Sequence, residues 1–200
     1  LIGTQMVSKG LDFDRVSVVG ILNADAMLNY PDFRAYEHAF MMMAQVSGRA
    51  GRKGQRGKVF LQTKNKDLAI IRQVVGNDYQ GFYEALLEER RMFSYPPFYR
   101  LVYVFLRHRH DDVVETAGIE MGSRLRQGLG DRILGPDKPS IARVKNLHIR
   151  KIVIKLENGI DQKAVRLYLR TVQQQLLQDK RYAALQVYYD CLLYTSLSGL

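Results

Sequence analysis

The first half of the chain alternates short apolar runs with segments of helical spacing. Residues 16–22, VSVVGIL, form a continuous β-branched run, which predicts a strand buried on both faces of a parallel sheet. Helices are predicted over residues 36–46, 67–75 and 78–93, and a second strand is predicted over residues 58–63. Strands that alternate with helices indicate an α/β layer built on a parallel sheet.

The second half follows the order strand, helix, strand, strand, helix, strand. We predict a strand at 100–108, one within 133–144, and strands at 149–156 and 185–190; the first helix covers 112–129. The order β-α-β-β-α-β is the ferredoxin-like pattern. That fold carries many unrelated functions, so the pattern alone identifies none of them.

Two acidic positions are candidates for capping the helices of this half. Asp112 and Glu115 form a capping-box-like pair ahead of apolar residues at helical spacing. Asp161 precedes a second helix whose apolar residues form one stripe: Val165, Leu169, Val172 and Leu176.

The stretch SYPPF, residues 94–98, separates the two halves. Pro96 cannot donate to a helix ladder, and Pro97 favours extended geometry in the residue before it. We therefore expect one domain over residues 1–94 and a second over 95–190, with a turn inside a single domain as the alternative.

Both ends of the chain have unusual sequences. The sequence begins at Leu1, within the strand-like segment LIGTQ and without an initiator methionine. We therefore expect a fragment whose preceding part is missing. Residues 191–200, CLLYTSLSGL, carry no charge and no helical stripe. We predict a non-native or unstructured tail there, and a small structured extension is the alternative.

The composition narrows the class of protein. The chain has 30 Lys and Arg residues against 20 acidic residues, and this net charge of +10 favours polyanionic partners. A single cysteine, Cys191, excludes a disulfide framework and a Cys-based zinc site, and fits a reducing compartment. No apolar run approaches the roughly 20 residues that span a bilayer, so we expect a cytoplasmic protein with no membrane partner and no secretory signal.

Glycines frame two arginines in the segment QVSGRAGRKGQRG, residues 45–57. Arg49 and Arg52 stand about one helical turn apart, so both side chains could face the same cleft. Guanidinium groups stay charged and bind phosphate bidentately, which lysine does not do. A solvated basic loop is the alternative, and it applies better to the cations that lack this frame: Lys53, Arg56 and Lys58.

A second segment, GTQMVSKGLDF at residues 3–13, has the composition of a ligand-binding loop. Thr4 offers a hydroxyl and a backbone N–H at the end of a strand, where open α/β sheets bind ligands. Gly10 allows close backbone approach, and the carboxylate of Asp12 could accept from a ribose hydroxyl. Taken alone, the segment is also compatible with an ordinary strand–loop–helix junction.

Together these segments resemble helicase motifs. QVSGRAGR resembles motif VI of superfamily 2 helicases, Q-x-x-G-R-x-G-R, and GTQMVSKGLDF resembles their motif V, in the right order and at a suitable interval. With VVGILNADAMLNYPDFRAYEHAF and RRMFSYPPFYRLV, they are similar to the primosomal protein N′ (PriA) family of replication-restart helicases. The resemblance covers residues 1–190.

The resemblance implies a fold and a function. Residues 1–94 would be the C-terminal part of a RecA-like second helicase lobe, and residues 95–190 a ferredoxin-like DNA-binding domain. The intact protein would be an ATP-dependent 3′→5′ DNA helicase that recognises stalled or branched forks and restarts replication by primosome assembly. Its implied partners are forked and single-stranded DNA, primosome proteins and single-stranded-DNA-binding protein, in the bacterial cytoplasm at the nucleoid.

The resemblance also implies roles for residues around the ATP site. Arg52 would be the arginine finger on the γ-phosphate, Arg49 would support the same phosphates, and Gln45 would connect the ATP state to lobe position. Gly10 and Asp12 would lie near the nucleotide ribose or the cleft between the lobes.

Part of this ATP site lies outside the sequence. The chain contains neither a G-x-x-x-x-G-K-[ST] phosphate loop nor a DExx-type magnesium segment. ATP and Mg²⁺ would therefore be bound mainly by the missing lobe, and the fragment alone is expected to be non-catalytic. The zinc-binding cysteines of the family lie upstream of motif V, so the ligands for Zn²⁺ are absent and no metal site is expected here.

DNA contacts are expected in two places. The resemblance implies that Thr4 contacts a DNA phosphate, with Gln5 as a weaker candidate. The run RVKNLHIRKIVIK, residues 143–155, is basic and contains no acid, and it carries the candidates Lys151 and Lys155. A phosphate-tracking surface for branched DNA and a solvated sheet face are both compatible with this run.

Several aromatic residues and two histidines remain open to more than one interpretation. The aromatic residues could stack on bases or pack between elements: Tyr95, Phe98, Tyr99, Tyr188 and Tyr189. His108 and His110 flank Arg109 at strand spacing, with no Cys or further His near in sequence.

Two other functions are compatible with the sequence. One is a different superfamily 2 helicase that acts on RNA or on junctions, and the other is a non-catalytic nucleic-acid-binding module.

Overall fold

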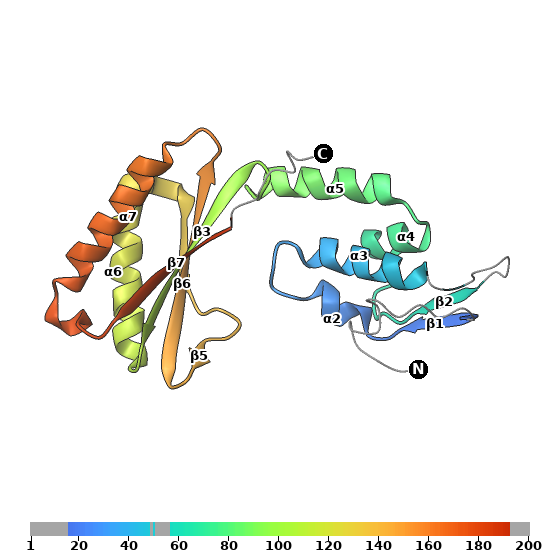
Figure 1. The fold of residues 1–200 in the computed structure, drawn as a ribbon, viewed down its shortest axis with the longest axis horizontal. Coiled ribbons are helices and arrows are strands. Elements are labelled where there is room, and N and C mark those ends of the chain that lie inside the picture. The colour runs from blue at the N-terminus through green and yellow to red at the C-terminus, as the bar shows by residue number, and fades with distance from the viewer. Residues whose placement is uncertain (1–15, 49, 51–56, 193–200) are drawn as a thin grey trace. The chain divides into compact units, whose positions relative to one another are not determined.

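The computed structural model describes residues 16–48, 50 and 57–192 (Figure 1). The chain divides into two compact units, residues 1–89 and residues 90–200. The division lies within the helix α5 (Tyr79–Met92), a few residues before the boundary that the sequence predicts at Ser94. Each unit has its own cluster of buried apolar side chains.

The first unit combines a small parallel sheet with helices. Strand β1 pairs with β2 in parallel, with Val18 opposite Lys58 and Ile21 opposite Leu61. The elements of this unit, in chain order, are β1 (Val18–Ile21), α2 (Ala24–Leu28), α3 (Ala35–Ser47), β2 (Lys58–Leu61), α4 (Ala69–Val75) and α5 (Tyr79–Met92). The predicted alternation of strands and helices on a parallel sheet is therefore present.

Strand β1 is far more exposed than its sequence suggests. Val18 is 56% exposed, and of the four residues of the strand only Ile21 is buried. Among the described residues β2 is the one strand that pairs with it. The expectation of a strand buried on both faces is wrong for these residues. A β-branched run favours a strand, but it does not determine whether other elements cover that strand.

Helix α2 was missed by the sequence patterns because it is short and non-periodic. Its N-cap, Asn23, has a left-handed backbone with φ 53°. The carboxylate of Asp25 accepts hydrogen bonds from Thr63 Oγ1 at 2.8 Å and from the backbone N–H of Lys64 at 2.9 Å. These bonds join α2 to the segment after β2, and they lower the pKa of Asp25 below its usual range, the Lys64 backbone bond most of all. Long-range bonds of this kind leave no local pattern in the sequence.

The helices of the first unit pack through aromatic contacts. The rings of Phe40 on α3 and Phe82 on α5 stack with centroids 4.2 Å apart. Met43 on α3 is fully buried, and Ile70 and Ile71 of α4 join the same cluster. The burial of such side chains is the main favourable term in the stability of a small core.

The second unit is an antiparallel sheet covered on one face by two helices (Figure 1). Its strand order is β4-β6-β3-β7, and the short β5 also pairs with β6. The elements are β3 (Tyr99–His108), α6 (Asp111–Leu129), β4 (Ile133–Asp137), β5 (Arg143–Val144), β6 (Leu147–Glu157), α7 (Gln162–Leu177) and β7 (Gln186–Leu192), with single 3₁₀ turns at Gly130–Arg132 and Lys180–Tyr182. The predicted order of strands and helices is present, with β5 as an addition.

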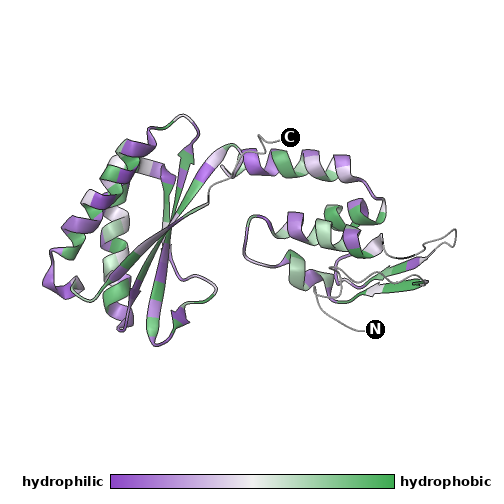
Figure 2. Cartoon of the chain, viewed as in Figure 1, coloured by the Kyte–Doolittle hydropathy of each residue, from purple (hydrophilic) through white to green (hydrophobic). Residues whose placement is uncertain are grey.

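Hydrophobic and hydrophilic residues both occur along the long central strands (Figure 2), and buried positions alternate with partly exposed ones over most of their length. On β3, Val102, Val104 and Leu106 are buried against the helices, whereas the residues between them belong to the opposite face. Strand β6 repeats the pattern with Ile152 and Ile154. This period of two is what a sheet with one covered face requires.

Strand β7 extends beyond the predicted domain end. Cys191 and Leu192, the first two residues of the segment predicted to be a tail, pair with Val102 and Leu101 of β3. Residues 193–200 lie outside the described residues.

The two predicted helix caps have different outcomes. Asp161 caps α7 as predicted, since its carboxylate accepts from the backbone N–H groups of Lys163 at 2.8 Å and Ala164 at 3.3 Å. The capping box at Asp112 is wrong. Helix α6 begins one residue earlier, at Asp111, and its N-cap His110 makes no side-chain cap bond.

Glu115, the other half of the predicted capping box, bonds to the buried side chain of Arg150. Arg150 lies on the helix-covered face of β6, where it is 2% exposed. Its guanidinium donates to Glu115 and, at 2.8 Å, to Asp111 Oδ1, and it also donates to the Ile149 carbonyl at 3.0 Å. Both carboxylates are on the first turn and a half of α6, so this network fixes α6 to β6. It also removes Arg150 from the basic surface that residues 143–155 suggested.

Replacing the α7 cap should destabilise the second unit. We expect Asp161→Ala to lower the free energy of unfolding by about 0.5–2 kcal/mol, because two helix N–H groups lose their acceptor. Urea denaturation followed by circular dichroism measures this change. Asp112→Ala is the matched control, with a smaller expected effect because Asp112 caps nothing; equal destabilisation by the two changes would contradict the assignment.

The Arg150 network should make the stability of the second unit depend on pH in the acidic range. The hydrogen bond from Arg150 holds the pKa of Asp111 below its ordinary value of 3.8. The unfolded chain therefore binds a proton more readily, so stability falls as pH drops from about 5 through the lowered pKa. We expect Arg150→Met to reduce this slope, and Arg126→Met, which removes a cation bonded to a carbonyl, to preserve it. An unchanged slope in Arg150→Met, measured by urea denaturation across this range, would contradict the prediction.

Candidate nucleic-acid interface

The face of the second sheet that lies opposite α6 and α7 is rich in aromatic and cationic side chains. On β3 this face carries Tyr103, Phe105 and Arg107, all partly exposed. The register places Lys151 of β6 and Tyr188 of β7 on either side of Phe105. We refer to these five residues, Tyr103, Phe105, Arg107, Lys151 and Tyr188, as the open face.

Planar groups on the open face contact one another across the strands. The rings of Phe105 and Tyr188 stack with centroids 4.9 Å apart and an interplanar angle of 11°. The guanidinium carbon of Arg107 lies 4.4 Å from the Tyr188 ring centroid, and its Nη2 donates to the Tyr188 hydroxyl at 2.5 Å. Tyr103 meets Phe105 edge-on, with centroids 6.2 Å apart. Such cross-strand pairs also contribute to sheet stability.

The two lysines predicted to contact DNA occupy different environments. The ammonium of Lys151 lies 5.2 Å from the Tyr103 ring centroid. The ammonium of Lys155 lies 4.0 Å from the Tyr95 ring centroid and donates to the Phe93 carbonyl at 2.5 Å, and its burial lowers its pKa. Lys155 therefore already joins the segment before β3 to the sheet, whereas Lys151 borders the open face.

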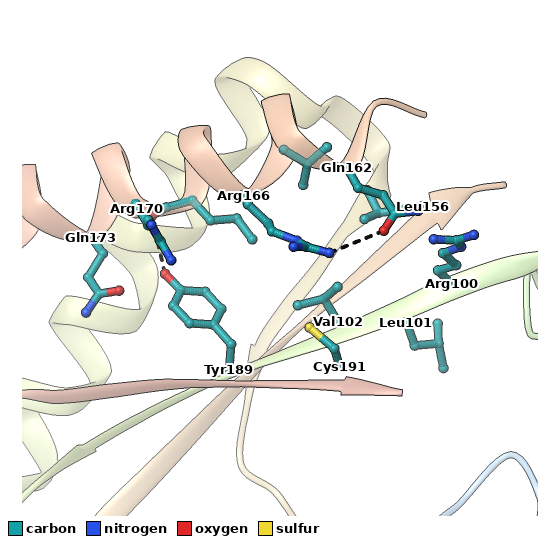
Figure 3. Close-up of a pocket in the computed structure, with 12 residues that line it drawn as sticks. Arg100, Leu101, Val102, Leu156, Gln162, Arg166, Arg170, Gln173, Tyr189 and Cys191 are labelled. Atoms are coloured by element: carbon teal, nitrogen blue, oxygen red, sulfur yellow. Dashed lines mark hydrogen bonds between the residues drawn. The ribbon is translucent and has the colours of Figure 1, made fainter. Parts of the chain in front are cut away.

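The ambiguous pair Tyr188 and Tyr189 divides between the two faces of the sheet. Tyr188 stacks on Phe105 on the open face. Tyr189 points toward α7, where its hydroxyl donates to the Leu169 carbonyl at 3.3 Å and its burial raises its pKa to about 12 (Figure 3). Only Tyr188 is therefore available to a ligand on the open face.

The other aromatic candidates pair with cations of the second unit. The guanidinium carbon of Arg91 lies 4.7 Å from the Phe98 ring centroid, and Tyr95 lies beneath Lys155 as described above. Tyr99 begins β3, opposite Glu157. These contacts favour packing over base stacking for the SYPPF segment.

A cavity of about 510 Å³ lies between α7 and the sheet (Figure 3). Its lining combines apolar side chains such as Val102 and Leu169 with three arginines, Arg100, Arg166 and Arg170. One of these, Arg166, donates to Gln162 Oε1 at 3.4 Å. The surface that lines the cavity is predominantly apolar.

Of the residues predicted for the ATP site, the structure describes Gln45. It lies exposed in the last turn of α3, as predicted from the helical pattern. The C-cap that follows it, Gly48, donates its N–H to the Ala44 carbonyl at 3.0 Å. The other predicted ATP-site and motif V residues lie outside the described residues: Thr4, Gln5, Gly10, Asp12, Arg49 and Arg52.

His108 and His110 form a local turn contact. The backbone N–H of His110 donates to His108 Nδ1 at 3.1 Å, and the ring centroids are 5.4 Å apart. In residues 16–48, 50 and 57–192 no three metal-ligating side chains come together. Among those same residues, each helix is too short or too polar to cross a lipid bilayer.

The open face was missed in part by the sequence analysis, although its signal was present. The run RLVYVFLRH was predicted to be a strand, and the side-chain period of two places Tyr103, Phe105 and Arg107 on one face of it. That Lys151 and Tyr188 lie beside them depends on the strand register, which long-range pairing sets and local sequence does not reveal.

Comparisons with known proteins identify relatives over most of the chain. The family of the primosomal protein N C-terminal domain matches residues 91–191. The replication restart protein PriA of Bacillus subtilis is 37% identical over 181 residues, which cover 87% of this chain and 22% of the relative. The replication restart protein PriA of Synechocystis is 35% identical over 162 residues, covering 80% of this chain and 20% of the relative.

A third relative gives the same result. The replication restart protein PriA of Treponema pallidum is 35% identical over 157 residues, which cover 78% of this chain and 24% of the relative. The chain thus spans about a fifth of the length of the relatives that it matches. From the family match and these identities, the chain belongs to the PriA family and is homologous to the C-terminal part of its members.

Proposed function

We propose that this chain is the C-terminal part of an ATP-dependent 3′→5′ DNA helicase that recognises stalled or branched replication forks and restarts replication by primosome assembly. The observation that carries the proposal is the segment QVSGRAGR, residues 45–52, in a chain of the PriA family. The relatives bear the name replication restart protein. The proposed partners are forked and single-stranded DNA, primosome proteins and single-stranded-DNA-binding protein, in the bacterial cytoplasm.

We further propose how the chain divides into working parts. Residues 1–94 form the C-terminal part of a RecA-like second lobe, which the parallel pairing of β1 and β2 supports. Residues 95–190 form a ferredoxin-like DNA-binding domain, which the strand order β4-β6-β3-β7 supports. Residues 193–200, the end of the predicted tail, have no role in this proposal.

In the proposed ATP site, guanidinium groups of this chain meet a phosphate held by another lobe. Arg52 contacts the γ-phosphate and stabilises the charge of the transition state, and Arg49 holds the neighbouring oxygens. The exposed position of Gln45 at the end of α3 leaves its amide able to reach a ligand. Gly10 and Asp12 border the ribose, and ATP with Mg²⁺ supplies the phosphoryl group when bound.

DNA contacts come from both parts of the chain in this proposal. Thr4 and Gln5 contact the strand that the lobes move. Lys151 and Lys155, four residues apart along β6, attract phosphates to the second unit. The net charge of +10 supports this role, because cations that displace counterions from DNA contribute binding free energy.

Removing Arg52 should abolish ATP hydrolysis without abolishing DNA binding. The test protein is the Bacillus subtilis relative with its C-terminal part replaced by this chain. We expect Arg52→Ala to lower the DNA-stimulated ATPase rate by about 10³-fold or more, because the transition state is left without its cation. ATPase assays and fork binding by fluorescence anisotropy measure the two properties.

Lys53→Ala is the matched control, since it removes a neighbouring cation outside the glycine frame. Its ATPase rate should stay close to that of the unaltered protein. Rescue of the rate by Arg52→Lys, or equal reductions of ATPase and fork binding in Arg52→Ala, would favour a non-catalytic binding module.

Neutralising the β6 lysines should change the salt dependence of DNA binding. We expect the double change Lys151→Ala and Lys155→Ala to reduce the slope of log Kd against log salt by about one for each phosphate that is no longer neutralised. Most of the effect should come from Lys151, because Lys155 is bound to the Phe93 carbonyl. Lys163→Ala, an exposed change on α7, is the control, and an unchanged slope in the double variant would remove this surface from the proposal.

A further inference from the structure

The open face has a composition that its structural role does not require. A sheet face turned away from its helices is ordinarily polar, with charged residues alternating against the core positions. Here the same positions of β3 carry Tyr103 and Phe105, and β7 adds Tyr188, all partly exposed. One stacked pair would stabilise the strands, but the cations next to the rings indicate a second use.

Cations lie close to the rings. The guanidinium carbon of Arg107 lies over the Tyr188 ring, 4.4 Å from its centroid. Lys151 is the direct strand partner of Phe105 and lies 5.2 Å from the Tyr103 ring centroid. The register also brings two acids to this face, Asp190 opposite Tyr103 and Asp137 opposite Lys151. Charges of both signs therefore border the rings, and the three partly exposed rings are the feature that favours a ligand with planar groups.

The dimensions of the face suit a short stretch of nucleic acid. From Tyr103 to Arg107 there are four residue-to-residue steps of extended strand, or roughly 13 Å at the usual rise per residue, and adjacent strands lie roughly 4.8 Å apart. Sheets of this size that carry exposed aromatic residues stack about two or three unpaired bases. Base stacking on aromatic rings is tolerant of sequence, while arginine and lysine track the backbone.

We propose that the open face binds single-stranded DNA by stacking bases on Phe105, Tyr188 and Tyr103. A base that stacks on the Tyr188 ring surface covered by Arg107 takes the place of its guanidinium, which turns to the adjacent phosphate. Lys151 contacts a phosphate on the other side of the ring pair. The inference rests on the proposed DNA function of the chain, and it adds the face and the residues that bind the single strand.

The test uses this 200-residue chain and oligo(dT) of about a dozen nucleotides, within the usual site size of such proteins. A matched abasic strand carries the same phosphates without bases. Phe105→Leu and Tyr188→Leu should each weaken binding of oligo(dT) by roughly 5- to 150-fold, the effect typical of removing one stacked base. Affinity for the abasic strand and the salt slope should stay unchanged, because no charge is removed.

Two further variants separate stacking from folding. Tyr188→Phe retains the ring and should retain most of the affinity. Tyr83→Leu removes an exposed aromatic side chain from α5 in the first unit and should leave oligo(dT) binding unchanged. Thermal denaturation of each variant establishes that the second unit remains folded.

Unaltered oligo(dT) affinity in folded Phe105→Leu and Tyr188→Leu would overturn this inference and leave the proposed helicase function intact. Equal weakening for oligo(dT) and the abasic strand would also overturn it, because phosphate contacts alone would then explain the binding. Tighter binding to oligo(U) or to duplex DNA would overturn the assignment to single-stranded DNA. Failure of the unaltered chain to bind any DNA would overturn both the inference and the DNA-binding part of the proposed function.

Discussion

The antiparallel pairing of β3 with β6 is the constraint on which the second unit depends. Ten residue pairs, from Tyr99 opposite Glu157 to His108 opposite His148, set which side chains point toward the helices. Since the side-chain period of a strand is two, a slip of one residue would exchange the buried residues with those of the open face. The register therefore determines both the core and the candidate binding surface, and a change of register would alter both.

The buried side chain of Arg150 helps to specify this register. An arginine on the covered face of β6 has to find partners there, because an unpaired buried charge costs several kcal/mol by the usual estimates. Asp111 and Glu115 of α6 provide those partners. Any other register of β6, or another rotation of α6, would separate the three groups. The ion network thus contributes to the choice of one arrangement as well as to its stability.

Local sequence patterns predicted most of the helices and strands. They failed where contacts between residues far apart in sequence determine the structure. The cap at Asp161 was predictable because its acceptor and donors lie within three residues of one another. At α6 the same type of pattern was misleading, since Glu115 bonds to Arg150, which lies 35 residues further along the chain. The alternation of β3 predicted a common face for Tyr103 and Phe105, but only the pairing of β3 with β7 brings Tyr188 there. Motif sequences predicted the proposed ATP-site residues, of which Gln45 is the one that the structure describes.

The bond between Lys155 and the Phe93 carbonyl has a consequence for how the chain can be divided. A second bond, from the Asn158 amide to the Pro97 carbonyl at 2.9 Å, joins the same segment to the end of β6. Residues 93–97 are therefore bound to the sheet although they precede its first strand in sequence. A shortened protein that begins at Tyr99 would leave the ammonium of Lys155 without its acceptor beside the central strand, whereas one that begins before Phe93 would retain it.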